Sequence, residues 1–253
     1  MLKVMHVGML VMVAGMMLMS ATTEAQDQKL SADTILQKME ENINGFKDQI
    51  MSVRLTIVDV GGAAKSYEFT INQKGDEKRL IRFTSGEFIG MATLIEDRDR
   101  VYIYLPGFKK VRRVAAHNMS QSFAGSDFSN EDMSTASWTK SYTASLDHED
   151  DGYWYLLCIP KPDSDLSYGK AIVKVNKKSF SQDGIEYYNK LGEKVKVFEN
   201  GNPTEFPGGL RNKNVQVSDP RTGHKTLLEV KDFKVNQGLP DSMFTVRELE
   251  WGR

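Results

Sequence analysis

With 253 residues, the chain carries 33 Lys and Arg against 34 Asp and Glu, which gives a formal net charge of −1. This balance argues against a dedicated nucleic-acid binder and against a polybasic membrane-surface protein, because both need an excess of basic residues. The single cysteine, Cys158, excludes an intramolecular disulfide and any zinc site built from several cysteines.

The first 25 residues have the pattern of an export signal. Lys3 precedes a mostly apolar run from Val4 to Met19, and small or polar residues follow up to Thr23-Glu24-Ala25. A signal peptidase recognises small residues at this spacing, and the run of about 16 residues is shorter than the roughly 20 that span a membrane. We therefore expect a cleaved signal peptide at 1–25, a single domain at 26–253 and a periplasmic location. An uncleaved membrane anchor is the alternative.

One helix is expected after the signal. Ser31 is a typical N-cap, and Asn44-Gly45 is a typical helix end. Between them Ile35, Leu36, Met39 and Ile43 recur at three- and four-residue spacing, which predicts one buried stripe.

The rest of the chain alternates hydrophobic and polar residues at the period of a β-strand. Turn residues such as Gly61-Gly62 separate these segments. Short strands at regular spacing predict an antiparallel all-β sheet or barrel, here of about eleven strands. The candidate strands are 51–57, 67–71, 80–83, 91–95, 101–105, 110–114, 139–146, 153–159, 169–176, 184–189, 194–199, 210–218 and 225–235.

Two of these segments, Val101–Leu105 and Tyr153–Ile159, are apolar on both faces. A one-layer sheet with a solvated face does not need this pattern, so something must cover the second face. Either the chain's own helices and loops cover it, or it lines an open apolar concavity. Because only one clear helix is available, the concavity is favoured. The candidate cavity-lining residues are Tyr102, Tyr104, Trp154 and Leu156, although alternation does not say which face points inward.

The sequence offers no catalytic constellation. His117, His148 and His224 show no metal-ligand spacing, and the nucleophile and phosphate-loop motifs are absent. Cys158 lies in an apolar strand and is expected to be a packed core thiol. We therefore expect no enzyme, no metal site and no cofactor.

The stretch 115–135 is long, weakly periodic and holds Phe123, Phe128 and Met133, so it is interpreted as a lid or binding segment. Asp127 is expected to fix its geometry by accepting backbone N–H bonds. The acidic group Asp127, Glu131 and Asp132 allows two interpretations. One is a weak paired-carboxylate site; the favoured one is a short helix capped by Asp127 or Ser129.

Four segments of this region resemble the central motif of the outer-membrane lipoprotein-sorting family, the LolA-like proteins of Gram-negative cell envelopes. The opening helix around 35–39 and the tail at 239–250 are similar as well, so the resemblance covers essentially the whole mature chain. The four segments are Tyr104-Leu105-Pro106, Lys110-Val111-Arg112-Arg113-Val114, Ser120-Gln121-Ser122-Phe123 and Gly125-Ser126-Asp127-Phe128-Ser129-Asn130-Glu131-Asp132.

The resemblance implies an incomplete antiparallel β-barrel with a helical or loop lid over an apolar cavity, in a Gram-negative periplasm. It implies a carrier of acyl chains of lipoproteins or lipids between inner-membrane machinery and the outer membrane, with an inner-membrane lipid transporter as a partner. Lys110, Arg112 and Arg113, with Lys109, are candidates for contact with an anionic head group or an acidic partner; the alternative is a protected edge strand. An envelope sensor or adaptor that binds a protein partner is the second functional hypothesis, and a hydrolase of envelope lipids is the third.

Overall fold

The computed structural model describes residues 29–134 and 137–251, so the signal peptide expected at 1–25 lies outside the described residues. The helices are α1 (Ala32–Asn44), α2 (Asn130–Ser134), α3 (Trp138–Ser141) and α4 (Val246–Trp251), with 3-10 turns η1 (Ala116–Asn118) and η2 (Asp241–Met243). The strands are β1 (Asp48–Val58), β2 (Ala64–Lys74), β3 (Lys78–Phe83), β4 (Ala92–Asp97), β5 (Arg100–Leu105), β6 (Lys110–Arg113), β7 (Tyr142–Glu149), β8 (Tyr153–Pro160), β9 (Tyr168–Asn176), β10 (Gln182–Asn189), β11 (Lys194–Phe206), β12 (Gly209–Ser218) and β13 (Lys225–Val235).

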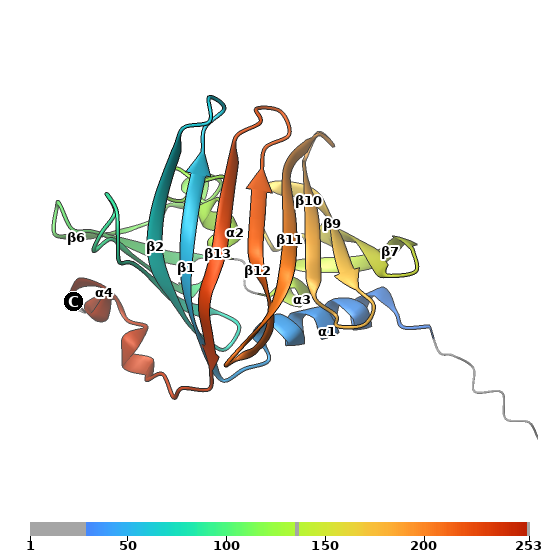
Figure 1. The fold of residues 1–253 in the computed structure, drawn as a ribbon, viewed down its shortest axis with the longest axis horizontal. Helices are drawn as coiled ribbons and strands as arrows, with labels where there is room; N and C mark the ends of the chain where they lie inside the picture. Colours follow the sequence, from blue (N-terminus) through green and yellow to red (C-terminus); the bar gives the residue numbers. More distant parts are fainter. Residues whose placement is uncertain (1–28, 135–136, 252–253) are drawn as a thin grey trace, which may run out of the picture.

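All thirteen strands belong to one antiparallel sheet in the order β6-β5-β4-β3-β2-β1-β13-β12-β11-β10-β9-β8-β7. The first and last strands pair at its centre, where Met51 lies opposite Phe233 (Figure 1). The sheet does not close on itself, which confirms the expected unclosed, mainly β architecture. The expected count of about eleven is too low, because each of the thirteen candidate segments contributes a strand to the sheet.

Local sequence signals account for the elements. In β2, Tyr67, Phe69 and Ile71 are buried while the residues between them are partly exposed, as the alternation predicts. The Ser31 hydroxyl accepts a hydrogen bond from Thr34 N at 3.2 Å and caps α1. Gly45 ends that helix with a negative φ, and a Cβ there would lie 2.4 Å from Glu41 O.

Some expected boundaries are wrong, among them the end of β11, which continues past residue 199 to Phe206. The strand expected at 139–146 begins at Tyr142, because residues 138–141 form the short helix α3. Ser137 caps this helix by accepting a hydrogen bond from Lys140 N at 3.3 Å, and Thr139 N donates to Glu40 in α1 at 2.7 Å. These contacts favour a helical turn over an extended chain.

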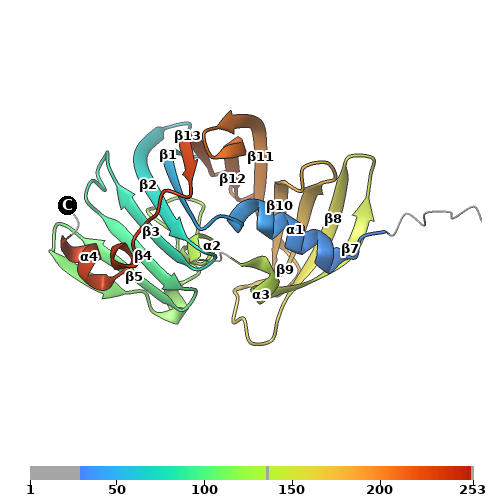
Figure 2. The ribbon, with the colours of Figure 1, turned by 90° about the horizontal axis from the view of Figure 1, so that it is seen from below.

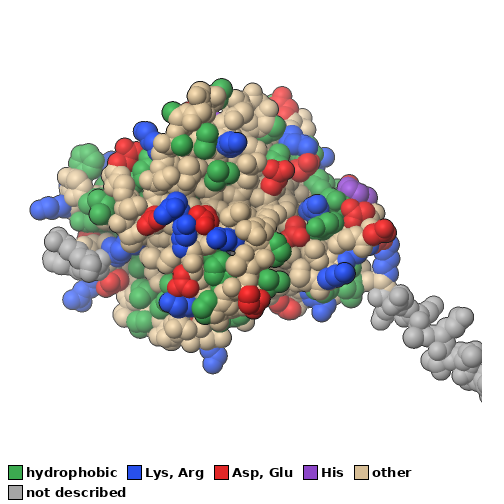
Figure 3. Space-filling view, in the orientation of Figure 1, with side chains coloured by type: hydrophobic (Ala, Val, Ile, Leu, Met, Phe, Trp, Pro, Cys, Tyr) green, Lys and Arg blue, Asp and Glu red, His purple; other side chains and the backbone are tan. Residues whose placement is uncertain are grey.

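The topology explains why one connection covers the concave face. β6 and β7 lie at opposite edges of the sheet, so the chain between them has to cross from one edge to the other. Figure 2 shows α2 and α3 on the inner side of the arched sheet, with α1 across its lower end. We call residues 115–134 the lid segment. The opposite, convex face carries charges of both signs (Figure 3), including the pair Arg54–Glu68 at 2.8 Å.

Candidate functional site

A cavity of about 610 Å³ lies on the concave side, between the centre of the sheet, the end of α1 and the lid segment. Its size falls within the range of small-molecule sites, roughly 300–1,000 Å³. The wall is apolar over much of its extent. The apolar lining residues are Ile43, Met51, Val53, Ile71, Ile81, Phe128, Met133, Trp138, Ile185, Tyr187, Phe198, Leu210, Val215, Leu228 and Val230.

The lid segment folds back on itself at its centre. Phe123 N donates to Phe128 O at 2.7 Å, and Ser126 N donates to Phe123 O at 3.0 Å. The two residues of the tight turn, Ala124 and Gly125, have φ of 51° and 72°, as a turn with a left-handed pair requires. This turn directs Phe123 against Phe69 and Phe83, and Phe128 against Phe198.

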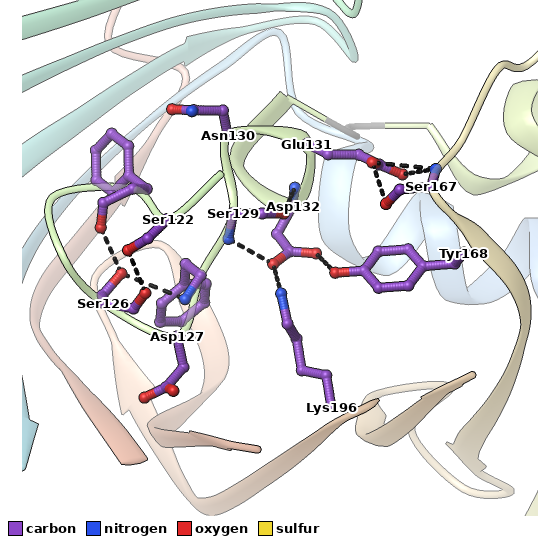
Figure 4. Close-up of polar contacts among 12 residues, drawn as sticks. Ser122, Ser126, Asp127, Ser129, Asn130, Glu131, Asp132, Ser167, Tyr168 and Lys196 are labelled. Atoms are coloured by element: carbon purple, nitrogen blue, oxygen red, sulfur yellow. Dashed lines mark hydrogen bonds and ion pairs between the residues drawn. The ribbon is translucent and has the colours of Figure 1, made fainter. Parts of the chain in front are cut away.

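Three carboxylates attach the lid segment to other parts of the fold, and Figure 4 shows the contacts of two of them, Glu131 and Asp132. Asp127 accepts hydrogen bonds from the side chains of His224, at 2.8 Å, and Thr226, at 2.7 Å, both at the start of β13. Glu131 accepts from the backbone and hydroxyl of Ser167 at 3.1 and 2.6 Å. The geometry therefore uses these carboxylates as anchors.

Asp132 forms the third anchor. Its carboxylate accepts from Tyr168 Oη at 2.9 Å and pairs with Lys196 Nζ, and the side chains of Asp132 and Lys196 are only 4% and 13% exposed. The lid is thereby tied to β9 and β11. Burial is also the main cause that raises the pKa of the neighbouring Glu131 carboxyl.

The capping interpretation holds in a modified form. Ser129 Oγ accepts from Asp132 N at 3.0 Å, and Asp132 accepts in return from Ser129 N at 2.7 Å, so these two residues form a reciprocal cap at the start of α2. The expectation that Asp127 accepts backbone N–H bonds is wrong. Its partners are side chains, because the turn before it brings the carboxylate against β13.

The structure places the candidate cavity-lining tyrosines elsewhere. Tyr102 and Tyr104 pack against Leu239, Phe244 and Leu249 of the C-terminal tail, and α4 contacts β4, β5 and β6. The other face of β5 belongs to the concave core. Both faces of this strand are therefore covered by the chain itself, which corrects the proposed cavity lining at Tyr102 and Tyr104.

Trp154 and Leu156 also lie outside the set of cavity-lining residues. They pack in the cluster formed by β8, β9 and the buried stripe of α1, where Leu156 is fully buried. On the opposite face of β8, Tyr155 stacks on His148 at 4.0 Å between ring centroids. The single predicted helix thus covers the face that we had assigned to cargo, and this assignment is corrected as well.

The basic segment Lys110, Arg112 and Arg113 is exposed on the edge strand β6 and does not line the cavity. Arg112 lies over the ring of Phe108, whose centroid is 6.0 Å away, and Phe108 is 69% exposed. Arg113 donates to Asp99 O at 3.1 Å. This position is compatible with both interpretations left open by the sequence. The basic residues can keep the edge strand from pairing with other chains, or they can form an external contact surface.

Sequence reasoning missed two arginines in the cavity wall. Arg79 donates to Gln73 Oε1 and to Met133 O, both at 2.8 Å. Arg211 donates to Ile43 O at 2.7 Å and to Gln49 Oε1 at 3.1 Å. Burial lowers the pKa of each guanidinium to about 10.

A signal for one of these arginines exists in the sequence. Arg79 is in phase with the buried Ile81 and Phe83, so strand alternation directs it to the concave face. Arg211 has no such signal, because it opens the polar run Arg211-Asn212-Lys213-Asn214.

Cys158 is fully buried in the α1 cluster, and burial raises the pKa of its thiol to about 12. A thiol with this environment is held protonated at neutral pH. Across residues 29–134 and 137–251, no group of three or more His, Cys, Asp or Glu side chains is arranged to hold a metal ion.

The fold and the lidded cavity define a LolA-like architecture, and solved structures share it. A DUF1329 family protein of Desulfovibrio piger has a TM-score of 0.80 at 23% identity, covering 86% of this chain and 97% of its own. A domain of Vibrio parahaemolyticus named for outer membrane lipoprotein sorting has a TM-score of 0.77 at 23% identity, with coverage of 87% and 98%. A LolA superfamily protein of Nitrosomonas europaea has a TM-score of 0.73 at 24% identity, with coverage of 86% and 99%.

A protein-family model described as "Uncharacterized protein" matches residues 75–251, more than half of the sequence, and the chain belongs to this family. Among curated proteins, no relative matches the sequence. The likeness to the solved structures, at these identities, establishes the LolA-like fold.

Proposed function

We propose that the protein is a non-catalytic carrier that binds acyl chains of lipoproteins or lipids in the concave cavity and moves them between inner-membrane machinery and the outer membrane. The observation that carries this proposal is the cavity of about 610 Å³ with an apolar wall beneath the lid segment. Burial of each methylene contributes about 0.8 kcal/mol, so one acyl chain can be held without specific polar contacts.

The lid supports the carrier hypothesis because it borders the cavity and contributes no strand to the sheet. Phe128 and Met133 line the cavity from the lid side, while Asp127, Glu131 and Asp132 attach the second half of the segment to Thr226, Ser167 and Tyr168. A segment outside the sheet can move without breaking strand pairing, and a carrier must release what it binds.

Binding of a fluorescent fatty-acyl probe to the delipidated protein tests the proposal. We expect saturable binding at micromolar concentration and displacement by unlabelled lipid, because the apolar wall offers a site for one chain. Fluorescence titration measures this. If no apolar probe binds the folded, delipidated protein, the carrier function is wrong, and the sensor or adaptor that binds a protein partner takes its place.

We also propose export to the periplasm of a Gram-negative bacterium with removal of residues 1–25. The small residues at Thr23-Glu24-Ala25 support cleavage before Gln26. N-terminal sequencing of the periplasmic protein should therefore begin at Gln26, whereas a full-length chain retained in the membrane fraction would contradict the proposal. In the described part of the chain, none of the helices has the length and apolar character to cross a bilayer.

The exposed basic edge is proposed as the contact with an anionic head group or an acidic partner, such as an inner-membrane lipid transporter. Lys110, Arg112 and Arg113 support this because they are exposed together beside the exposed ring of Phe108. A cationic surface with a neighbouring aromatic ring attracts anionic partners over about one Debye length.

A further inference from the structure

One side of the cavity is polar, and its residues form a closed series of contacts that we call the polar rim. Asn42 in α1 donates to Ser179 O at 3.0 Å, and Ser181 Oγ donates to Asp183 at 2.7 Å. Asn212 donates to the same carboxylate at 3.0 Å, and the adjacent Arg211 donates to Ile43 O in α1. The rim residues are Asn42, Ile43, Ser179, Ser181, Asp183, Arg211 and Asn212, and all of them line the cavity.

Arg211 has hydrogen-bonding capacity that the fold does not use. Its two partners among the described residues, Ile43 O and Gln49 Oε1, both accept from Nη2. A guanidinium has five N–H donors, and within the described residues Nε and Nη1 have no acceptor. The central carbon of the group lies over the ring of Phe233, 4.5 Å from the ring centroid, which restricts its position in the cavity wall.

The charge of Arg211 is also uncompensated. Its partners are a carbonyl and an amide oxygen, and no ion pair joins Arg211 to a carboxylate in the described part of the chain. Asp183, the carboxylate of the rim, is satisfied by Ser181 and Asn212 instead. Arg211 is partly buried, and a cation removed in part from water gains stability when an anion pairs with it.

A second arginine in the cavity wall also lacks an ion pair within the described residues. Arg79 likewise donates only to an amide oxygen and a carbonyl, Gln73 Oε1 and Met133 O. The other cavity-lining carboxylate, Asp132, is already paired with Lys196. The described cavity wall therefore combines apolar side chains with two guanidinium groups, Arg79 and Arg211, that form no ion pair with its carboxylates Asp132 and Asp183.

We propose that Arg211 binds the anionic group of the cargo, a carboxylate or phosphate carried at the end of an acyl chain, an inference that rests on the carrier function proposed above. The chain lies against Met51, Leu228 and their apolar neighbours, while the anion accepts a charge-assisted hydrogen bond from Nη1 of Arg211 at the polar rim.

Matched ligands test the proposal on the full, delipidated protein. Palmitate is compared with cetyl alcohol, and palmitoyl lysophosphatidic acid with monopalmitoylglycerol, by displacement of a neutral acyl probe. We expect each anionic ligand to bind about tenfold more tightly than its neutral partner, because a hydrogen bond to a charged group contributes about 1.5 kcal/mol or more. Inorganic phosphate and acetate alone show whether a free anion suffices without a chain.

The variant Arg211→Gln should lower affinity for the anionic ligands about tenfold and leave the neutral ones unchanged, and Arg211→Lys should restore part of the preference. Lys213→Gln is the control, because Lys213 lies on the same strand, pairs with Glu229 and does not line the cavity. Equal binding of acid and alcohol by the wild type overturns the proposal even if the variant fails to fold. If the variant loses affinity for anionic and neutral ligands equally, Arg211 has only a structural role at the end of α1, and the proposal is wrong. Failure of every ligand to bind refutes the carrier function itself.

Discussion

Replacement of Asp132 by Ala is expected to lower the free energy of unfolding by about 3–5 kcal/mol, because it leaves the ammonium of Lys196 buried without its counter-charge. The two side chains are 4% and 13% exposed, so water replaces little of the lost interaction. Tyr168 loses its hydrogen-bond acceptor, and the start of α2 loses half of its reciprocal cap. Urea unfolding followed by tryptophan fluorescence and circular dichroism measures the change.

The exposed pair Arg54–Glu68 on the convex face provides the matched control. Its side chains are 46% and 44% exposed, so Glu68→Ala should cost less than about 1 kcal/mol. Amide exchange should also accelerate across 120–134 in Asp132→Ala and remain unchanged in Glu68→Ala. Similar small losses of stability in both variants would show that the Asp132–Lys196 pair does not hold the lid.

Substitution of Leu228 by Trp is expected to reduce acyl-probe affinity at least about tenfold while the sheet stays folded. Leu228 lines the cavity from β13 and is only partly buried, so the added ring extends into the space proposed for the chain. The loss of even two methylenes of burial corresponds to more than a tenfold change in affinity. Titration with the fluorescent acyl probe measures the effect.

The neighbouring Leu227 supplies the control on the same strand. Its side chain is 39% exposed and does not line this cavity, because adjacent residues of a strand point to opposite faces. Leu227→Trp should bind the probe like the wild type. If Leu228→Trp retains full affinity in a folded protein, the acyl chain binds elsewhere and the proposed cavity is wrong.

Much of the fold could be predicted because its signals are local. The Ser31 cap and the stripe at Ile35, Leu36 and Met39 predict α1, and strict alternation predicts the strands. The lid could be placed because Phe123 and Phe128 interrupt an otherwise polar, aperiodic segment. The topology places this segment over the concave face, since it joins the two edges of the sheet.

The cavity lining could not be predicted from alternation alone. A strand that is apolar on both faces shows that each face is covered, but it does not reveal what covers it. At Tyr102 and Tyr104 the cover is a tail that includes the six-residue helix α4, too short to give a clear periodic signal. At Leu156 the cover is α1, which lies more than a hundred residues earlier in the chain. Such long-range packing decides which of several apolar faces stays open.

The pairing of β1 with β13 has a consequence for how the chain reaches its folded state. β1 is made first and β13 last, so during synthesis each of the two meanders, β1 to β6 and β7 to β12, can form from neighbouring segments before the seam between them exists. Contacts between distant segments form slowly, and until then an open strand edge is available for pairing with other chains. Pairing of β13 with β1 and β12 therefore covers the strand edges that could otherwise bind other chains. A chain that stops before Lys225 would form two meanders with no strand to join them.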